Sequence, residues 1–274
     1  MMKKEYVCLS ILKRMKVFKK IFNFGSKKEE KIEWWSDIEG LPGVVPIETS
    51  SNFIPKWWTN MPMWQNDDVK EANTKNNIVN KGTVRRCPAI REFMGMGFTV
   101  PLWCDLEVNI FDDGGYKWNT PSGTFTFGNH GASQLGDWVP KHSSPTLILK
   151  PNCPWRVRTP PGVSMLQLPM FWHFNPNFTV APGVIWTDIH HEINQQMMFH
   201  KKGRIRLERG TPLAQYIPIR RETIPHTVTE ETPELRTARN TSFFHVRTKF
   251  GGGYPQHRKE TIKKGECPYH ATSK

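Results

Sequence analysis

The sequence predicts a mainly β protein, built as an antiparallel barrel or sandwich with a few short helices and a C-terminal helix. The first observation is the alternation in "LEVNIF", which places Leu106, Val108 and Ile110 on one face of an extended chain. The second is the turn "DDGG" at 112–115, which leads directly into another β-prone run, "YKWN". The third is a content of 22 Pro and 20 Gly, which favours many turns over long helices.

Further short runs of β-branched, aromatic and aliphatic residues recur at close intervals along the chain. In "PWRVRTPPGVSMLQL" one run stands on each side of the Pro-Pro-Gly turn at 160–162, so we expect strand, turn and strand there. The other predicted strands lie at 124–128, 146–150, 184–193, 204–210 and 213–219.

Two segments have the pattern of helices. Pro88 suits the first position of a short helix, and Ile90, Phe93 and Met94 then share one of its faces. Nearer the C-terminus, Thr232 is suited to cap a helix that we expect at about 233–249.

Charge and composition divide the chain into three parts. Ten Lys or Arg against three Glu make residues 1–31 basic, and seven against two make residues 247–274 basic. The residues between them hold only +1 of the total charge of +13. We therefore expect a basic amphipathic extension and linker at 1–31, a main β-rich domain at 32–246 with its β core at about 100–220, and a basic tail at 247–274.

The composition also limits compartment and partners. Five widely spaced cysteines do not suggest a disulfide framework and are typical of free thiols. No apolar run reaches the roughly 18 residues of a membrane span, and the N-terminus lacks the pattern of a signal peptide, so we expect neither a transmembrane segment nor secretion. The two basic ends are either solvated tails or contacts for nucleic acid or an anionic membrane.

The segment "APGVIWTDIHHEI" at 181–193 holds the densest group of chemically versatile side chains. If it is a strand, Trp186, Asp188, His190 and Glu192 share one face. Three ligands at every second position span roughly 13 Å, too far for one ion, so at most two of them would bind a metal, with help from elsewhere. Asp188 and His190 are the weak candidates. The alternative interpretation is a strand whose outer face is polar.

Several enzyme classes lack their local signatures. The glycine-rich "FGGGYPQH" has no Lys and no Ser or Thr in the places that a phosphate-binding loop requires, and no Gly-x-Ser-x-Gly elbow is present. No cysteine stands in a local nucleophile motif. We therefore commit to no catalytic residue from motifs alone.

Two stretches together resemble the third and fourth motifs of the dUTPase and dCTP deaminase superfamily. The third motif, Gly-Val-Ile-Asp-x-Asp-Tyr-x-Gly-Glu-Ile, is matched with its spacing by Gly183, Val184, Ile185, Asp188, Glu192 and Ile193. The fourth, Lys-Gly-Asp-Arg-Ile-Ala-Gln, is matched by Gly210, Ala214 and Gln215. The resemblance implies a β-clip fold for about 100–220, a homotrimer, and ligand-binding candidates Trp186, Asp188, His190 and Gln215.

This chain departs from the superfamily where catalysis is located. Trp186 stands at the position of the aspartate that activates water, and no general base remains there. Pro169 is not followed by the Arg-Ser of the preceding motif, and His191 replaces a glycine. The resemblance thus supports the fold of the superfamily for this chain but not its catalytic activity.

The wider pattern resembles an uncharacterised protein family of tailed phages and bacteria. The residues that carry this likeness are "PLWCDLEV", "FGNHG", "PWRVRTPPG" and "RLERGTPLAQYIP". It implies a location in the cytoplasm of an infected bacterial host or in the virion.

We expect a phage-encoded, non-enzymatic binding or assembly protein without a cofactor, whose partner is another protein or a second copy of itself. One alternative is a nucleotide-binding protein or nucleotide hydrolase that uses Asp188, Glu192 and Gln215 around a different centre, with Mg²⁺. The other is attachment to nucleic acid or membrane through 1–31 and 247–274.

Overall fold

The computed structural model describes residues 30–64, 82–130 and 145–248. Among these residues, the strands form four sheets in which every pairing is antiparallel. The chain divides into two compact units. Unit 1 comprises Met1–Phe53 and Met96–Arg221, and unit 2 comprises Ile54–Gly95 and Glu222–Lys274.

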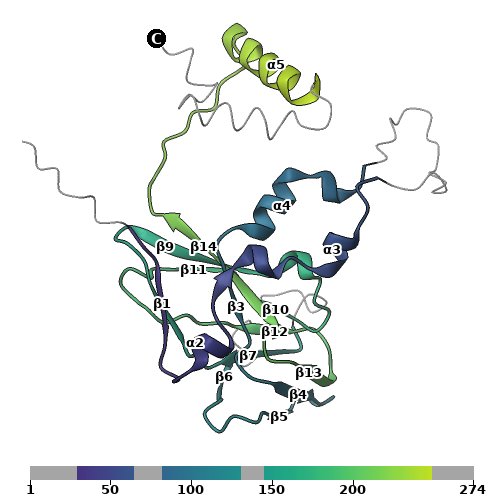
Figure 1. Cartoon of the computed structure of the whole chain (residues 1–274), viewed down its shortest axis with the longest axis vertical. Coiled ribbons are helices and arrows are strands. Elements are labelled where there is room, and N and C mark those ends of the chain that lie inside the picture. Colours follow the sequence, from purple (N-terminus) through teal and green to yellow (C-terminus); the bar gives the residue numbers. More distant parts are fainter. Residues whose placement is uncertain (1–29, 65–81, 131–144, 249–274) are drawn as a thin grey trace, which may run out of the picture. The chain divides into compact units, whose positions relative to one another are not determined.

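A five-stranded sheet forms the largest element of unit 1 (Figure 1). Its strand order is β11, β9, β14, β3, β2, so β14 lies in the middle and β11 lies at an edge. The bounds are β2 Glu48–Thr49, β3 Phe98–Pro101, β9 Val163–Pro169, β11 Gly183–Ile185 and β14 Pro212–Arg220.

Gly97, which precedes β3 in this sheet, lies close to the backbone of Tyr216 in β14. Gly97 has a φ of 65°, and a Cβ there would lie 2.1 Å from the Tyr216 carbonyl oxygen. Only glycine fits a position that is both left-handed and in contact with backbone.

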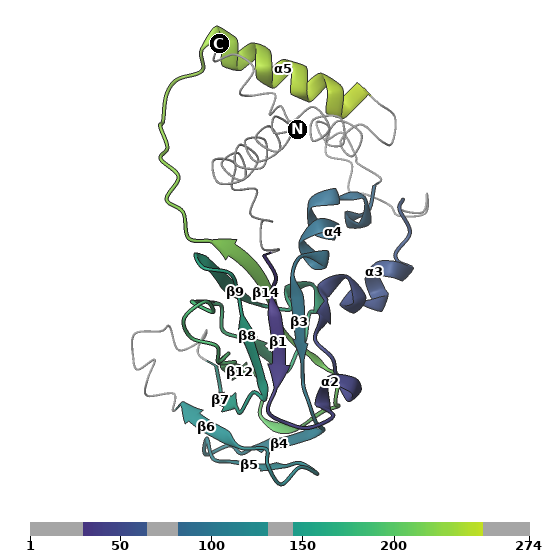
Figure 2. The same cartoon turned by 60° about the vertical axis from the view of Figure 1, so that its left-hand side comes forward.

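Three smaller sheets complete unit 1. A four-stranded sheet has the order β10, β12, β7, β6, a three-stranded sheet the order β13, β4, β5, and β1 pairs with β8 (Figure 2). The bounds are β1 Glu33–Ser36, β4 Leu106–Ile110, β5 Tyr116–Asn119, β6 Phe127–His130, β7 Leu147–Pro151, β8 Trp155–Arg158, β10 Phe178–Val180, β12 Met197–Phe199 and β13 Gly203–Leu207.

The hairpin expected around 112–115 is confirmed. β4 and β5 pair with Ile110 opposite Tyr116, and the turn is closed by Asp113 Oδ1, which accepts the Gly115 N–H at 2.8 Å. Gly114 supplies the left-handed residue of this turn with a φ of 85°.

The two strands expected on either side of the Pro-Pro-Gly turn are also present, but they belong to different sheets. β8 pairs with β1, whereas β9 pairs with β14 and β11. Gly162, with a φ of 78°, lies at the point where the chain passes from one sheet to the other.

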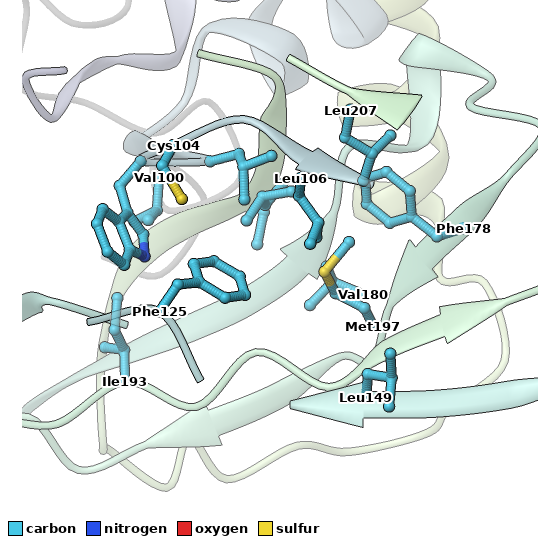
Figure 3. Packing of buried hydrophobic residues seen from close by; sticks show 14 of the residues in the cluster. Val100, Cys104, Leu106, Phe125, Leu149, Phe178, Val180, Ile193, Met197 and Leu207 are labelled. Carbon is cyan, nitrogen blue, oxygen red and sulfur yellow. The ribbon is translucent and has the colours of Figure 1, made fainter. Parts of the chain in front are cut away.

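The core of unit 1 lies between these sheets. Leu106, Val108 and Ile110 are each at most 2% exposed, as the alternation predicts. Figure 3 shows side chains from several strands turned toward a shared interior, with Phe125 among them. The core also buries a polar pair, because the Tyr216 hydroxyl donates to Gln167 Oε1 at 2.6 Å.

Short helical segments also occur in both units. Unit 1 holds α2 Leu41–Val44 and the 3₁₀ turns η1 Ser50–Phe53 and η6 Phe171–His173. Unit 2 holds α3 Lys56–Asn60, the 3₁₀ turn η2 Val84–Arg86, α4 Pro88–Gly95 and α5 Pro233–Thr248.

The two helices expected from the sequence are confirmed. α4 begins at Pro88, and α5 is preceded by Thr232, whose Oγ1 accepts the Leu235 N–H at 3.3 Å.

The predicted fold class is confirmed as mainly β, with antiparallel sheets and short helices. The sheets of the described residues do not close into a barrel, so the sandwich is the form that fits.

No helix in the described part of the chain is long and apolar enough to cross a membrane. The described cysteines, Cys87, Cys104 and Cys153, are free thiols as expected. The basic extension, most of the basic tail and the domain boundaries drawn from them lie outside the described residues and stay predictions.

Shortening a core side chain of β4 should destabilise the protein strongly. Leu106→Ala removes a side chain that is 1% exposed and leaves a cavity, so we expect a loss of about 2–5 kcal/mol in the free energy of unfolding. Urea denaturation measures this loss. Lys117→Ala on the exposed side of β5 is the control, with an expected change within about 0.5 kcal/mol.

Candidate functional site

The segment 181–193, which the sequence marks as chemically richest, is not one continuous strand. β11 ends at Ile185, and the chain then turns, with the Ile189 and His190 N–H groups both donating to the Trp186 carbonyl at 3.0 and 2.8 Å. The prediction that four polar and aromatic side chains alternate onto one face is therefore wrong. Trp186 and Asp188 both contact Arg221, whereas Glu192 pairs with Arg156 and His190 is exposed.

Asp188 forms a bidentate ion pair with Arg221, the residue that follows β14. Arg221 Nη1 donates to Asp188 Oδ1 at 2.8 Å, and Nη2 donates to Oδ2 at 2.5 Å. The Gly162 N–H donates to Oδ2 at 2.9 Å, and Arg221 Nη1 also reaches Ser164 Oγ at 2.8 Å. We call this set of contacts among Asp188, Arg221, Gly162 and Ser164 the Asp188 clamp.

The clamp keeps Asp188 ionised. The hydrogen bonds from the Arg221 guanidinium are the main cause that lowers the pKa of Asp188 to about 2, and the Gly162 N–H adds to the effect. The side chain is only 8% exposed. A carboxylate with such a low pKa is a weak proton acceptor, and its oxygens already accept three donors, so it is poorly suited to activate water.

Trp186 lies over the clamp and is open to solvent. The Arg221 guanidinium carbon is 4.4 Å from the centre of the Trp186 ring, a cation–π contact that holds the indole in place. Trp186 is nevertheless 54% exposed, and its neighbours Val184 and Ile189 are 52% and 70% exposed. We call Val184, Trp186 and Ile189 the apolar turn. A group of large exposed apolar side chains beside an edge strand is typical of a contact surface.

Two of the remaining polar residues of the segment, His191 and Glu192, have structural contacts. His191 Nδ1 donates to the Thr187 carbonyl at 3.0 Å, and its ring packs edge-on against Trp35 at 5.6 Å. Glu192 lies 3.7 Å from the Arg156 guanidinium, which also pairs with Asp37. His190 is exposed at the end of the turn.

Gln215, the other predicted ligand-binding residue, lies elsewhere in unit 1. It is 2% exposed, and its Nε2 donates to the Met96 carbonyl at 2.7 Å. Gln215 precedes Arg221 by six residues on an extended chain, which separates it from the clamp by about 20 Å. The structure therefore does not bring Asp188, Glu192 and Gln215 together around one centre.

A metal ion would also find few ligands near the turn. Within the described ranges, no three His, Cys, Asp or Glu side chains lie close enough together to hold one. The pair Asp188 and His190 is further weakened because Arg221 already occupies the carboxylate oxygens of Asp188.

Sequence reasoning missed the residues that complete the site, namely Arg221, Gly162 and Ser164. "IPIRR" at 217–221 did offer an available cation at the end of a predicted strand. Its partner is 33 residues away, and no local periodicity identifies such a pair.

Comparisons with known proteins find similar solved structures but no family. No family model matches the chain, and no curated protein matches it. Among similar solved structures is a native dUTPase of EIAV, 14% identical, with a TM-score of 0.28, covering 49% of this chain and 83% of that one. A likeness at this TM-score supports no conclusion about activity or assembly.

The Asp188 clamp should make stability depend on acidity in a defined window. Because the pKa is lowered from 3.8 to about 2, the stabilisation is present above about pH 4 and is lost as pH falls through about 2. Asp188→Asn should therefore lower the urea midpoint at pH 7, and the gap to the wild type should narrow toward pH 2.

Asp112→Asn serves as the control, since the Asp112 side chain is fully exposed. It should leave the urea midpoint nearly unchanged at either pH. An Asp188→Asn variant as stable as the wild type at pH 7 would contradict a stabilising clamp.

Proposed function

We propose that this chain is a non-enzymatic binding or assembly protein that associates with further copies of itself through the apolar turn. The observation that carries the proposal is the contrast within one turn. The carboxylate that was the candidate for chemistry is held by arginine, while the aromatic side chain beside it is held open to solvent.

The state of Asp188 supports a role outside catalysis. A general base needs a pKa near the working pH and an oxygen free to accept a proton. Asp188 has a pKa of about 2, and both of its oxygens accept hydrogen bonds within the clamp. Glu192 and Gln215 are held by other partners, so neither replaces it.

The apolar turn has the features of a protein contact. Aromatic side chains that are fixed before binding lose little entropy on association, and Trp is enriched at the energetic centres of interfaces. Trp186 is fixed in this way by Arg221, and Ile189 beside it is 70% exposed. We expect a homotrimer as the assembly, following the superfamily that the sequence resembles.

The exposed indole also supports a second candidate, nucleotide binding. Trp186 presents one ring face to Arg221, and an indole that is 54% exposed is a platform on which a base can stack. In this alternative Mg²⁺ would accompany the phosphates, as expected for a nucleotide hydrolase.

Two further parts of the proposal rest on the sequence alone. The phage resemblance suggests a role in the infected bacterial cytoplasm or in the virion. Attachment to nucleic acid or an anionic membrane through 1–31 and 247–274 concerns mainly residues outside those that the structure describes.

Replacing Ile189 should abolish self-association without unfolding the chain. Ile189→Asp puts a charge on a side chain that is 70% exposed, so burial at an interface becomes costly while the free chain is little affected. Light scattering after size exclusion should give three times the 31.8 kDa chain mass for the wild type and one chain mass for the variant.

Ile224→Asp is the matched control, because Ile224 is 80% exposed in unit 2 and lies outside the apolar turn. It should keep the wild-type mass. A monomeric wild type at high micromolar concentration would contradict self-association.

Incubation with a panel of nucleotides and Mg²⁺ or Mn²⁺ separates the two candidate functions. We expect no turnover and no shift of the melting temperature. Turnover that survives Asp188→Asn but not Trp186→Ala would instead support a nucleotide site built on the indole.

A further inference from the structure

A cavity of about 420 Å³, open to solvent, lies in unit 1 and is lined by none of the residues of the apolar turn. Four separate segments line it: 38–44, which includes α2, 103–105 between β3 and β4, Pro121, and Arg209 between β13 and β14. A second hollow of about 250 Å³ shares Val44 and Arg209 with the first. The size is in the range of sites for small organic molecules.

One wall of this cavity is apolar and firmly held. Leu41 and Trp103 are 6% and 8% exposed, and the Trp103 indole donates to the Asn152 carbonyl at 3.2 Å. Its ring packs against Phe125 at 5.4 Å. The wall is therefore set before any ligand enters, which lowers the entropic cost of binding.

The Cys104 thiol belongs to this wall and is not an activated nucleophile. Burial raises the pKa of Cys104, and its sulfur lies 3.1 Å from Thr120 Oγ1. A thiol with a raised pKa stays protonated at neutral pH and contributes contact area only.

Charges of both signs border the same cavity. Arg209 forms no ion pair within the described ranges, in contrast to Arg156, Arg158 and Arg204, which each contact a carboxylate. Glu39 and Asp105 also line the cavity without an ion-pair partner among the described residues. Asp105 Oδ1 accepts the Arg209 N–H at 2.7 Å, which fixes the backbone of Arg209 and leaves the other carboxylate oxygen available.

We propose that this cavity binds a small zwitterion with an apolar side chain, in chemical terms an α-amino acid with an aliphatic or aromatic side chain. Arg209 takes the carboxylate, Glu39 and Asp105 take the ammonium group, and Trp103 and Leu41 contact the side chain. This site shares no residue with the apolar turn, so the proposal of ligand binding does not depend on the proposal of self-association.

The charge pattern disfavours other small ligands. A nucleoside triphosphate would bring several negative charges to a cavity with one guanidinium and two carboxylates. A plain hydrocarbon would make no use of the exposed charges of Glu39, Asp105 and Arg209. A zwitterion complements both signs at once.

Calorimetric titration of the full chain with L-phenylalanine and L-leucine tests the proposal. Phenethylamine lacks the carboxylate, hydrocinnamate lacks the ammonium group, and N-acetyl-L-phenylalanine blocks it. Each should bind at least about tenfold more weakly than L-phenylalanine, because a charged partner in the cavity is left unpaired.

Substitutions in the cavity give a second arm of the test. Arg209→Gln and Glu39→Gln should each weaken L-phenylalanine binding by about tenfold or more. Arg206→Gln is the matched control, since Arg206 is an exposed arginine of β13 outside this cavity, and it should bind like the wild type. Urea denaturation of each variant checks that it folds.

Three results would overturn the proposal. They are the absence of binding by any α-amino acid at about 10 mM, equal binding of phenethylamine and L-phenylalanine, and unchanged affinity in a folded Arg209→Gln variant.

Discussion

The ion pair between Arg221 and Asp188, with its hydrogen bonds to Gly162 and Ser164, joins three parts of unit 1 that are distant in the chain. Arg221 follows the central strand β14, and Asp188 lies in the turn after edge strand β11. Gly162 belongs to the turn before β9, and Ser164 lies in β9 itself. A carboxylate that is only 8% exposed is stable as an anion only when its charge is matched and its oxygens are hydrogen-bonded. The clamp meets both conditions.

The clamp also affects the two side chains of the turn that were candidates for function, Asp188 and Trp186. The guanidinium that neutralises Asp188 supports the Trp186 ring at 4.4 Å, so one side chain removes a candidate base and fixes an exposed aromatic group. Both effects support the proposed role in binding rather than in proton transfer.

Charges elsewhere in unit 1 follow two patterns. Along the sheet edges, arginines and carboxylates pair across neighbouring strands, as Arg204 does with Glu107 and Arg158 with Glu33. Such exposed pairs contribute little to stability. Around the cavity near α2, opposite charges border one hollow without pairing in the described residues, which leaves them available to a ligand. We therefore propose two different kinds of binding, one at the apolar turn and one at this cavity.

The sequence by itself determined the local elements. Alternation predicted β4, turn residues predicted the β4–β5 hairpin, and Pro88 and Thr232 marked the starts of α4 and α5, because each of these signals acts within a few residues. Only the tertiary structure decided that β8 and β9 enter different sheets, that Arg221 reaches Asp188, and that Gln215 lies far from both. These outcomes depend on which distant segments pack together. The pattern of a single segment does not determine which of several nearby arginines reaches Asp188.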